Sequence, residues 1–315
     1  MRRAVHAPAG PVLFVFVDGV GLGEDDPAVN PFLKAQLPTL DALLDGRRPT
    51  ASAAPIHTAE ASVVGLDARL GVDGLPQSGT GQAALLTGEN APRLFGRHFG
   101  PWTPTALRPL VAERSILARA VAAGVRVAFA NAYPEEVLEA DDVAAPRGRS
   151  PLRAGPPLAA RAAGLLTRHT DALARGDAVA SEITNDGWRE HLGRLAVPVI
   201  TAENAGRNLA RIAGGHDLTF FAHYATDTAG HRRDMADAVA ALERVDRFLA
   251  GILDALPDDR LLVVASDHGN LEDIRAGHTM NPALALVVGR GHAEFAASLR
   301  SLTDVAPAIL ERIGA

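Results

Sequence analysis

Carboxylate and imidazole side chains stand at the ends of several apolar runs of the sequence or in the segments that follow them. They are Asp18 in "FVDGVG", Asp227 and His231 in "YATDTAGH", Asp267 and His268 in "ASDHGN", and His278 in "AGHTMNP". Taken singly, such an Asp is often a turn residue and such a His a hydrogen-bonded bystander. Carboxylates that converge repel one another unless cations lie between them. The set as a whole therefore predicts a site for two divalent cations.

The residue types also indicate which cations and which chemistry. Aspartate oxygen and neutral imidazole nitrogen suit Zn²⁺ or Mn²⁺, and the histidines argue against a Ca²⁺ or Mg²⁺ site built only from oxygen. Cysteine is absent from the sequence, which excludes thiolate ligands and a thiolate nucleophile. Two such cations close together clamp the attacking and leaving oxygens of a displacement at phosphorus. We therefore expect phosphoryl transfer on a small phosphorylated substrate.

A nucleophile is offered by "LPQSGTGQAALLTG" at residues 75–88. The chain is expected to turn at Gly79 and Gly81 and to enter a helix over 82–87. Ser78 and Thr80 would then lie at a helix N-terminus, where free N–H groups attract an anion. Either hydroxyl could attack phosphorus, and the alternative is that Ser78 only caps the helix.

Short apolar runs and helical patterns alternate along the chain, and these elements must position the ligands. Strands are expected at Val12–Val17 and in the runs that start at Val125, Leu218, Arg260 and Leu284. Helices are expected at 38–44, 116–123, 203–212, 235–256 and 302–313. The alternation predicts an α/β fold: a mainly parallel sheet with helices on both faces and ligands at the carboxyl ends of the strands.

Residues 133–198 interrupt this alternation with clustered Pro, Gly and Arg, followed by an Ala-rich helical stretch from Leu158 to Arg175. We interpret 133–198 as a small inserted cap, with 1–132 and 199–315 as the metal-binding core. Its arginines could face a phosphate or could be ordinary surface residues, and both interpretations stay open. They are Arg147, Arg149, Arg153, Arg161 and Arg168.

Composition narrows the possible partners and locations. A net charge of -6 and a pI near 6.0 disfavour a nucleic-acid partner. No apolar run approaches the ~20 residues needed to cross a bilayer. The run at Val12–Val17 is too short for a secretion signal and ends in Asp18, so we expect a cytoplasmic protein that does not bind membranes. The oligomeric state does not follow from the sequence.

Two other classes of function are to be compared with phosphoryl transfer: a dinucleotide-binding protein and a catalytically silent metal-binding protein. Gly19, Gly21 and Gly23 follow the first strand, as in a dinucleotide-binding turn, but the pattern is incomplete and the acidic residues after Gly23 would repel a pyrophosphate. A catalytically silent metal-binding protein would bind metal without turnover, and Ser78→Ala would then affect only helix capping. Nothing in the sequence favours this second class.

The motifs resemble those of the alkaline phosphatase superfamily of two-metal phosphatases, phosphomutases and sulfatases. "FVDGVGLG" followed by "NPFLKAQLPTLDALL" is similar to the N-terminal block of cofactor-independent phosphoglycerate mutases, and "ATDTAGH", "SDHGNLED" and "GHTMNP" are similar to their metal motifs. "SGTGQAALLTG" is similar to the nucleophile segments of both mutases and sulfatases. Both alignments place the nucleophile at Ser78 and leave Thr80 as the second choice.

The resemblance implies a ligand set for each cation. One would be held by Asp18, Ser78, Asp267 and His268, and the other by Asp227, His231 and His278. The mutases have Gly-His where this chain has Gly81-Gln82, and the sulfatase signature is incomplete, which disfavours a sulfatase. Because the inserted segment is short, we favour hydrolysis through a phosphoserine, with a phosphomutase as the alternative.

Overall fold

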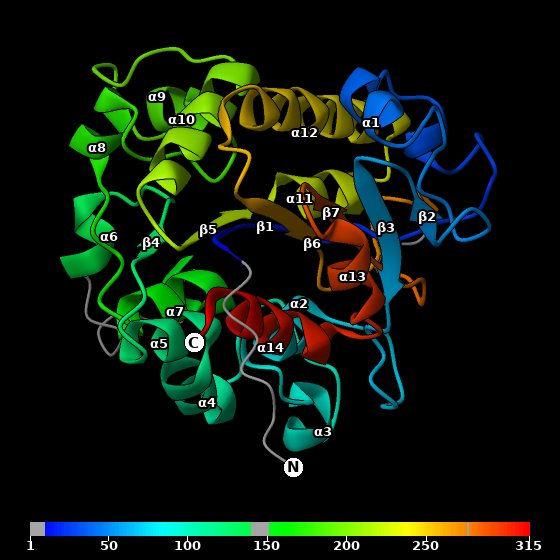
Figure 1. The fold of residues 1–315 in the computed structure, drawn as a ribbon, viewed down its shortest axis with the longest axis horizontal. Helices are drawn as coiled ribbons and strands as arrows, with labels where there is room; N and C mark the ends of the chain where they lie inside the picture. The colour runs from blue at the N-terminus through cyan, green and yellow to red at the C-terminus, as the bar shows by residue number, and fades with distance from the viewer. Residues whose placement is uncertain (1–9, 140–150, 276) are drawn as a thin grey trace.

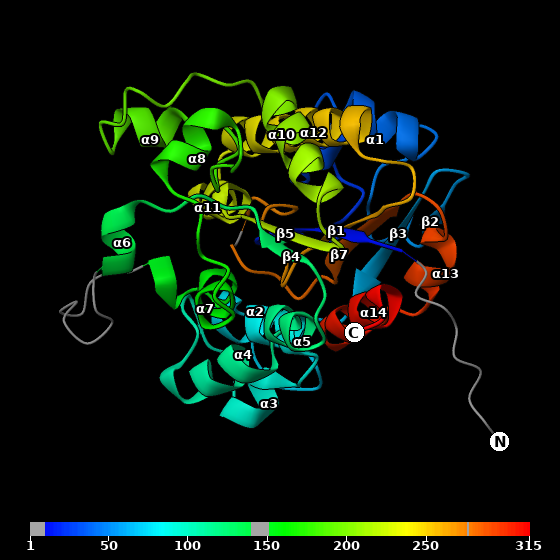
Figure 2. The ribbon, with the colours of Figure 1, turned by 60° about the vertical axis from the view of Figure 1, so that its left-hand side comes forward.

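A seven-stranded sheet forms the middle layer of the computed structural model, which describes residues 10–139, 151–275 and 277–315. The strands are β1 (Val12–Val17), β2 (Ile56–His57), β3 (Ala61–Leu66), β4 (Val127–Phe129), β5 (Leu218–His223), β6 (Leu261–Ala265) and β7 (Ala283–Val288). Helices cover both faces of the sheet (Figure 1; Figure 2). They are α1 (Pro38–Leu43), α2 (Ser78–Thr87), α3 (Ala91–Phe95), α4 (Arg108–Arg114), α5 (Ile116–Ala122), α6 (Glu135–Glu139), α7 (Gly155–Ala162), α8 (Thr170–Arg175), α9 (Asp186–Glu190), α10 (Ala202–Gly214), α11 (Ala225–Arg232), α12 (Met235–Ala255), α13 (His292–Ala297) and α14 (Leu302–Ile313).

Strand β1 lies inside the sheet and is buried over its whole length. Val12, Phe14 and Phe16 belong to an apolar cluster that includes residues of α2 and α14. Leu13, Val15 and Val17, which alternate with them, belong to a second apolar cluster that includes residues of α10 and α12. Because both faces of the strand are covered, its sequence is continuously apolar instead of alternating with polar residues. The chain therefore has an apolar core on each side of the sheet.

The strand order is β2-β3-β7-β6-β1-β5-β4. The four strands β6, β1, β5 and β4 are parallel to one another. The pairs β6–β7, β7–β3 and β3–β2 are antiparallel. The predicted α/β fold with a mainly parallel sheet is thus confirmed, with an antiparallel edge. Strand β3 was not predicted, because its short run "ASVVGL" contains a glycine and depends on pairing with the distant β7.

Predicted helix boundaries agree closely with α1, α5, α10, α12 and α14, but one stretch differs. The Ala-rich stretch from Leu158 to Arg175 is not one helix, because α7 ends at Ala162 and Gly164 adopts a left-handed φ of 71° before α8 begins. Thr39 and Leu40, in the first turn of α1, donate backbone N–H bonds to the buried carboxylate of Asp246 in α12. A distant side chain therefore caps α1.

The described part of residues 133–198 falls into two regions. Helix α7 lies in the helix layer with α2, α4 and α5, on one face of the sheet (Figure 2). Further along, Trp188 and Val197 belong to a separate small apolar cluster with Ala132, Leu173, Ala178 and Ala180. The division into a core and an inserted cap stays a prediction, and Arg147 and Arg149 lie outside the described residues.

Within the described part of the chain, every helix is too short or too polar to span a bilayer. Residues 1–9, which precede the run considered as a secretion signal, lie outside the described residues. The cytoplasmic location and the absence of nucleic-acid and membrane partners stay predictions.

Candidate metal centre and active site

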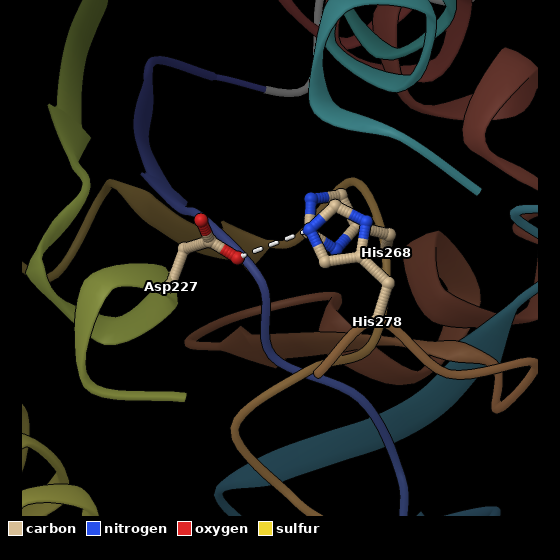
Figure 3. Close-up of side chains that lie close together, drawn as sticks. All are labelled: Asp227, His268 and His278. Atoms are coloured by element: carbon tan, nitrogen blue, oxygen red, sulfur yellow. Dashed lines mark ion pairs between the residues drawn. The ribbon is translucent and has the colours of Figure 1, made fainter. Parts of the chain in front are cut away.

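The carboxyl ends of three adjacent parallel strands bring the predicted ligands together. Asp18 directly follows β1, Asp227 lies in the first turn of α11 after β5, and Asp267 and His268 follow β6. His278 comes from the loop between β6 and β7, and it lies beside His268 and faces Asp227 (Figure 3). This convergence is what a parallel sheet imposes on the ends of its strands.

Asp18, Asp267 and His268 form the first group of potential ligands, and all are buried. Nε2 of His268 lies 3.3 Å from Oδ1 of Asp18 and 3.7 Å from Oδ2 of Asp267. Oδ2 of Asp267 makes no hydrogen bond to any described residue. A buried carboxylate oxygen without a donor is costly, and a cation at this position would satisfy it.

Asp227, His231 and His278 form the second group. The side chains of Asp227 and His231 lie on one face of α11, four residues apart, with Oδ2 to Nε2 at 3.2 Å. Nε2 of His278 is 3.2 Å from Nε2 of His231 and 3.6 Å from Oδ1 of Asp227. Ligand atoms of Asp227, His268 and His278 all lie within 4.8 Å of one another, so the two groups adjoin at His268. Their donor types fit the two divalent cations that the sequence predicts.

Backbone carbonyls orient two of the imidazoles. Nδ1 of His278 donates to the carbonyl oxygen of Pro76 at 2.9 Å, and Nδ1 of His268 donates to that of Gly269 at 3.2 Å. A carbonyl can only accept, so the proton stands on Nδ1 and, in the neutral ring, the lone pair is on Nε2. Both Nε2 atoms face the site, which is the arrangement that a metal-binding histidine requires.

The concentration of charge shifts the ionisation of these groups. Burial and then the charge of Asp267 raise the pKa of Asp18 well above its usual value. Burial alone would lower the pKa of His268, but the carboxylates of Asp267 and Asp18 outweigh burial and raise it to about 10. Burial and then the charge of His268 lower the pKa of His278 to about 4. Without a cation the site thus holds a proton that a cation would replace.

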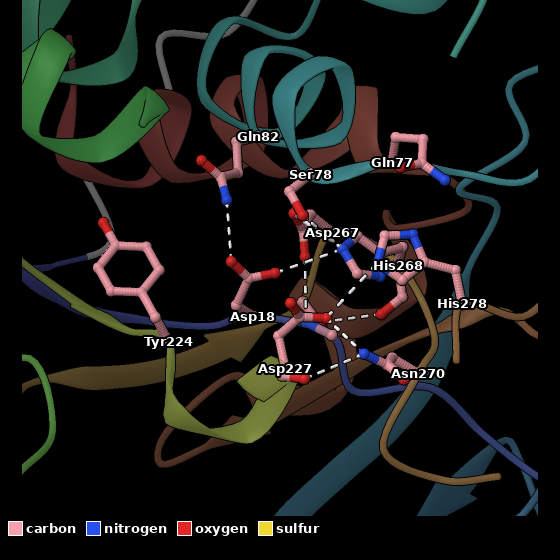
Figure 4. Close-up of polar contacts among 12 residues, drawn as sticks. Asp18, Gln77, Ser78, Gln82, Tyr224, Asp227, Asp267, His268, Asn270 and His278 are labelled. Carbon is pink, nitrogen blue, oxygen red and sulfur yellow. Dashed lines mark hydrogen bonds and ion pairs between the residues drawn. The ribbon is translucent and has the colours of Figure 1, made fainter. Parts of the chain in front are cut away.

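Ser78 is the first residue of α2, and its hydroxyl points into this site (Figure 4). The expected turn through Gly79 and Gly81 is wrong, because the helix already begins at Ser78. The glycines instead permit close approach: a Cβ on Gly79 would lie 2.1 Å from the carbonyl oxygen of Trp102, and one on Gly81 would lie 3.0 Å from that of Asp267.

The hydroxyl of Ser78 does not cap the helix, since the N-cap is Gln77 and makes no side-chain capping bond. Oγ of Ser78 lies 2.9 Å from Nε2 of His268, and the side chain is almost fully buried. Thr80 lies two positions further along the helix, which turns its side chain to another side. The hydroxyl of Thr80 accepts a hydrogen bond of 3.1 Å from the backbone N–H of Phe99 and donates one to the carbonyl oxygen of Phe99.

Three polar residues of this site were not predicted, although all stand within the quoted motifs. Gln82 donates from Nε2 to Oδ2 of Asp18 at 3.0 Å, and Asn270 donates from Nδ2 to Oδ1 of Asp227 at 2.6 Å (Figure 4). The fully buried carboxylate of Glu272 binds the loop that carries His278. Their positions beside the ligands in the sequence were the available signal.

A cavity of about 260 Å³ opens beside Ser78, Asp18 and Asp227. Trp102, Tyr133, Tyr224, Ser181, Gln82 and Thr228 are among the residues that line it. Of the arginines considered as phosphate contacts, Arg168 instead binds the carbonyl oxygens of Phe129 and Asp177. The cavity is large enough to hold a small ester next to the hydroxyl of Ser78.

Part of the chain that carries this site is similar to a known family of proteins. Residues 198–315 match the model of the Metalloenzyme superfamily. The 2,3-bisphosphoglycerate-independent phosphoglycerate mutase of Cereibacter sphaeroides is 32% identical over 127 residues, which cover 37% of this chain and 25% of that protein. The phosphopentomutase of Deinococcus radiodurans is 35% identical over 118 residues, which cover 36% and 30%. The structure of the PH0037 protein from Pyrococcus horikoshii shares the fold, with a TM-score of 0.56 and 13% identity over 97% of both chains.

The family match spans the segment that carries the second ligand group together with Asp267 and His268. The predicted resemblance to alkaline-phosphatase-superfamily metalloenzymes with mutase-like motifs is therefore confirmed. The matched segments span less than a third of either mutase.

Proposed function

We propose that this chain is a two-metal phosphoryl-transfer enzyme that hydrolyses a small phosphomonoester through a phosphoserine at Ser78. The observation that carries the proposal is the position of Oγ of Ser78, 2.9 Å from Nε2 of His268 and beside the buried carboxylate of Asp18. A nucleophile placed next to the predicted ligands would meet a phosphoryl group held at the same point.

Each part of the site would have a defined task. Two cations, Mn²⁺ or Zn²⁺ in our proposal, would supply charge for the phosphoryl oxygens and lower the pKa of the Ser78 hydroxyl. Asp18, Asp267 and His268 would hold one of them, with Ser78, and Asp227, His231 and His278 the other. The N-terminus of α2 adds positive potential where the phosphoryl group would sit.

The bonds exchanged in the proposed reaction are simple. Oγ of Ser78 would form a bond to phosphorus as the bond to the alcohol oxygen breaks, and that oxygen would leave with a proton. Water would then attack phosphorus as the bond between Oγ and phosphorus breaks, inorganic phosphate would leave, and a proton from the water would pass to Oγ. The cavity beside Ser78 would hold the departing alcohol.

A second candidate is a phosphomutase, favoured by the names of the two curated relatives. A mutase must retain the dephosphorylated product beside the phosphoserine, which calls for an enclosing cap. Helix α7, which is part of the short 133–198 segment, packs in the helix layer with α2 and α4. Fewer residues of the segment are therefore left to enclose a bound product. We therefore favour hydrolysis.

The test is release of phosphate from an aryl phosphate by metal-stripped protein reloaded with Mn²⁺ or Zn²⁺. Ser78→Ala should abolish turnover while metal content and fold stay unchanged. Ser181→Ala, which removes another hydroxyl from the same cavity, is the matched control and should retain turnover. Thr80→Val tests the second choice of nucleophile.

The possible outcomes separate the alternatives. Turnover retained by Ser78→Ala would overturn the phosphoserine mechanism, and turnover lost only in Thr80→Val would identify the other hydroxyl. Wild-type protein that forms acid-stable phosphoserine but transfers it to a second hydroxyl of a substrate, and not to water, would be a phosphomutase.

A further inference from the structure

A second cavity, of about 220 Å³, lies against α11. It is lined by residues from the end of β5, from α11 and from α12, and α11 packs directly against α12 (Figure 1). Its polar lining residues are His223, Thr228, Arg232, Asp237 and Arg244, and the rest of its lining is alanine. Thr228 also lines the cavity beside Ser78, so the two cavities are neighbours.

His223 lines this cavity and has an unsatisfied acceptor. The residue is 1% exposed, and its Nδ1 donates to the carbonyl oxygen of Ser181 at 2.7 Å. Burial lowers the pKa of His223 to about 4, so its ring is neutral and Nε2 carries the lone pair. Nε2 has no hydrogen-bond partner among the described residues. An acceptor buried in this way requires a donor from a ligand or from water.

The same cavity carries an excess of positive charge. Arg232 forms an ion pair of 3.2 Å with Asp237, both at the exposed rim. Arg244 makes no hydrogen bond or ion pair with another described residue. The nearby carboxylate of Glu182, which acts on Arg244 only at longer range, accepts a hydrogen bond from the backbone N–H of Gly187. Arg244 is thus available to bind an anion, and the positive charge of Arg232 is only partly neutralised by Asp237.

These features together define the ligand. It must offer a negatively charged oxygen to Arg244 and a hydrogen-bond donor to Nε2 of His223. Hydrogenphosphate carries both, because it keeps one proton at neutral pH. Sulfate is fully ionised and would turn a bare oxygen toward the lone pair of His223. A phosphomonoester, with its second pKa of about 6, lacks the donor at pH 8.

We propose that this cavity is a binding site for free inorganic phosphate, separate from the two predicted metal ligand groups, in which Arg244 binds the anionic oxygens and His223 accepts from the P–OH group. The bound ion would connect β5, α11 and α12. Because Asp227 and Thr228 are adjacent residues of α11, phosphate here would also hold the helix that carries part of the second ligand group.

Calorimetric titration of the full chain with phosphate and with sulfate at pH 8 tests the proposal. The wild-type chain should bind phosphate at least about tenfold more tightly than sulfate at this site. Arg244→Gln should weaken phosphate binding by a similar factor. Arg247→Gln, on the same helix but paired with Glu203, is the matched control and should leave binding unchanged.

Two further variants separate this site from the metal centre. Asp267→Asn, which alters the metal centre alone, should retain phosphate binding. His223→Asn keeps a donor for the carbonyl oxygen of Ser181 but has no acceptor at the position of Nε2, so it should abolish the preference for phosphate over sulfate. A phosphate site lost in Asp267→Asn but kept in Arg244→Gln would be the metal centre only and would overturn the proposal.

The source of the phosphate is tested with the methyl phosphate dianion, added to Ser78→Ala so that it is not consumed. Binding at least about tenfold weaker than that of inorganic phosphate is expected, because the dianion offers no donor to His223. Binding of methyl phosphate or sulfate as tight as that of phosphate would overturn the proposed role of His223. None of these binding measurements depends on turnover by Ser78.

Discussion

Gln82 donates a hydrogen bond of 3.0 Å from Nε2 to Oδ2 of Asp18, and its Oε1 accepts another of 3.0 Å from the backbone N–H of Gly155. The side chain is 2% exposed. Gln82 stands where the resembling mutases have histidine. In this chain, therefore, a neutral amide connects a predicted metal ligand to the segment 133–198 and fixes the orientation of the Asp18 carboxylate.

Gln82→Leu should weaken binding of the cation held by Asp18 by about 10- to 100-fold, because the carboxylate loses the donor that orients it. Competition with a chromophoric chelator measures this affinity. Gln36→Leu, at an exposed position, is the control and should bind metal as the wild-type chain does. Unchanged affinity in Gln82→Leu would mean that the hydrogen bond to Asp18 has no part in metal binding.

Cation binding at the first ligand group should release about one proton at pH 8. The metal-free pKa of His268 is about 10, so the imidazole is protonated at pH 8 and must lose its proton to become a ligand. Affinity should therefore rise by about tenfold per pH unit as the pH increases toward 10 and then level off. Calorimetry in buffers of different ionisation enthalpy counts the protons.

His191→Asn, which changes an exposed histidine, should release the same number of protons as the wild-type chain. Affinity that is independent of pH between 7 and 9 would contradict the raised pKa of His268.

Removing the cations with a chelator should lower the melting temperature, because the buried carboxylates of Asp18 and Asp267 then repel each other. At a free metal concentration 100 times Kd, a cation stabilises the fold by about 2.7 kcal/mol. Asp267→Asn should lose most of this metal-dependent increase, whereas Asp171→Asn, an exposed change, should keep it. An equal increase in Asp267→Asn would show that Asp267 is not a ligand.

Much of the fold could be predicted because its elements are continuous in the sequence. The apolar run of β1 is marked by its own composition, and Asp18, Asp267 and His268 lie at or just after strand ends, where a parallel sheet gathers its ligands. The local sequence was enough to predict these strands, because a strand that is buried on both faces is a continuous apolar run.

Other features depend on partners that are distant along the chain. Strand β3 exists through its pairing with β7, the first turn of α1 is capped by Asp246, and the amide of Gln82 is defined by Asp18 and Gly155. None of these partners leaves a mark on the local sequence, because tertiary contacts override local propensity. The helix start at Ser78 was misplaced for a related reason: its glycines meet other backbone segments and do not form a turn.

The carboxylate of Glu272 should be sensitive to substitution. It is fully buried and accepts four hydrogen bonds, from the backbone N–H groups of Gly21 and Asn270 and from the side chains of Thr279 and Asn281. Glu272→Gln would place an amide N–H₂ against donors, so at least one group loses its partner. We expect a loss of about 2–4 kcal/mol in the free energy of unfolding.

Urea denaturation of metal-free protein measures this loss without a contribution from the cations. Glu311→Gln, an exposed change in α14, should alter the free energy by less than about 0.5 kcal/mol. Because Thr279 follows His278 directly, Glu272→Gln should also weaken the second metal site, which metal titration of the folded variant would detect. A free energy of unfolding equal to that of the wild-type chain would mean that these donors find other acceptors, and that Glu272 does not hold the loop in place.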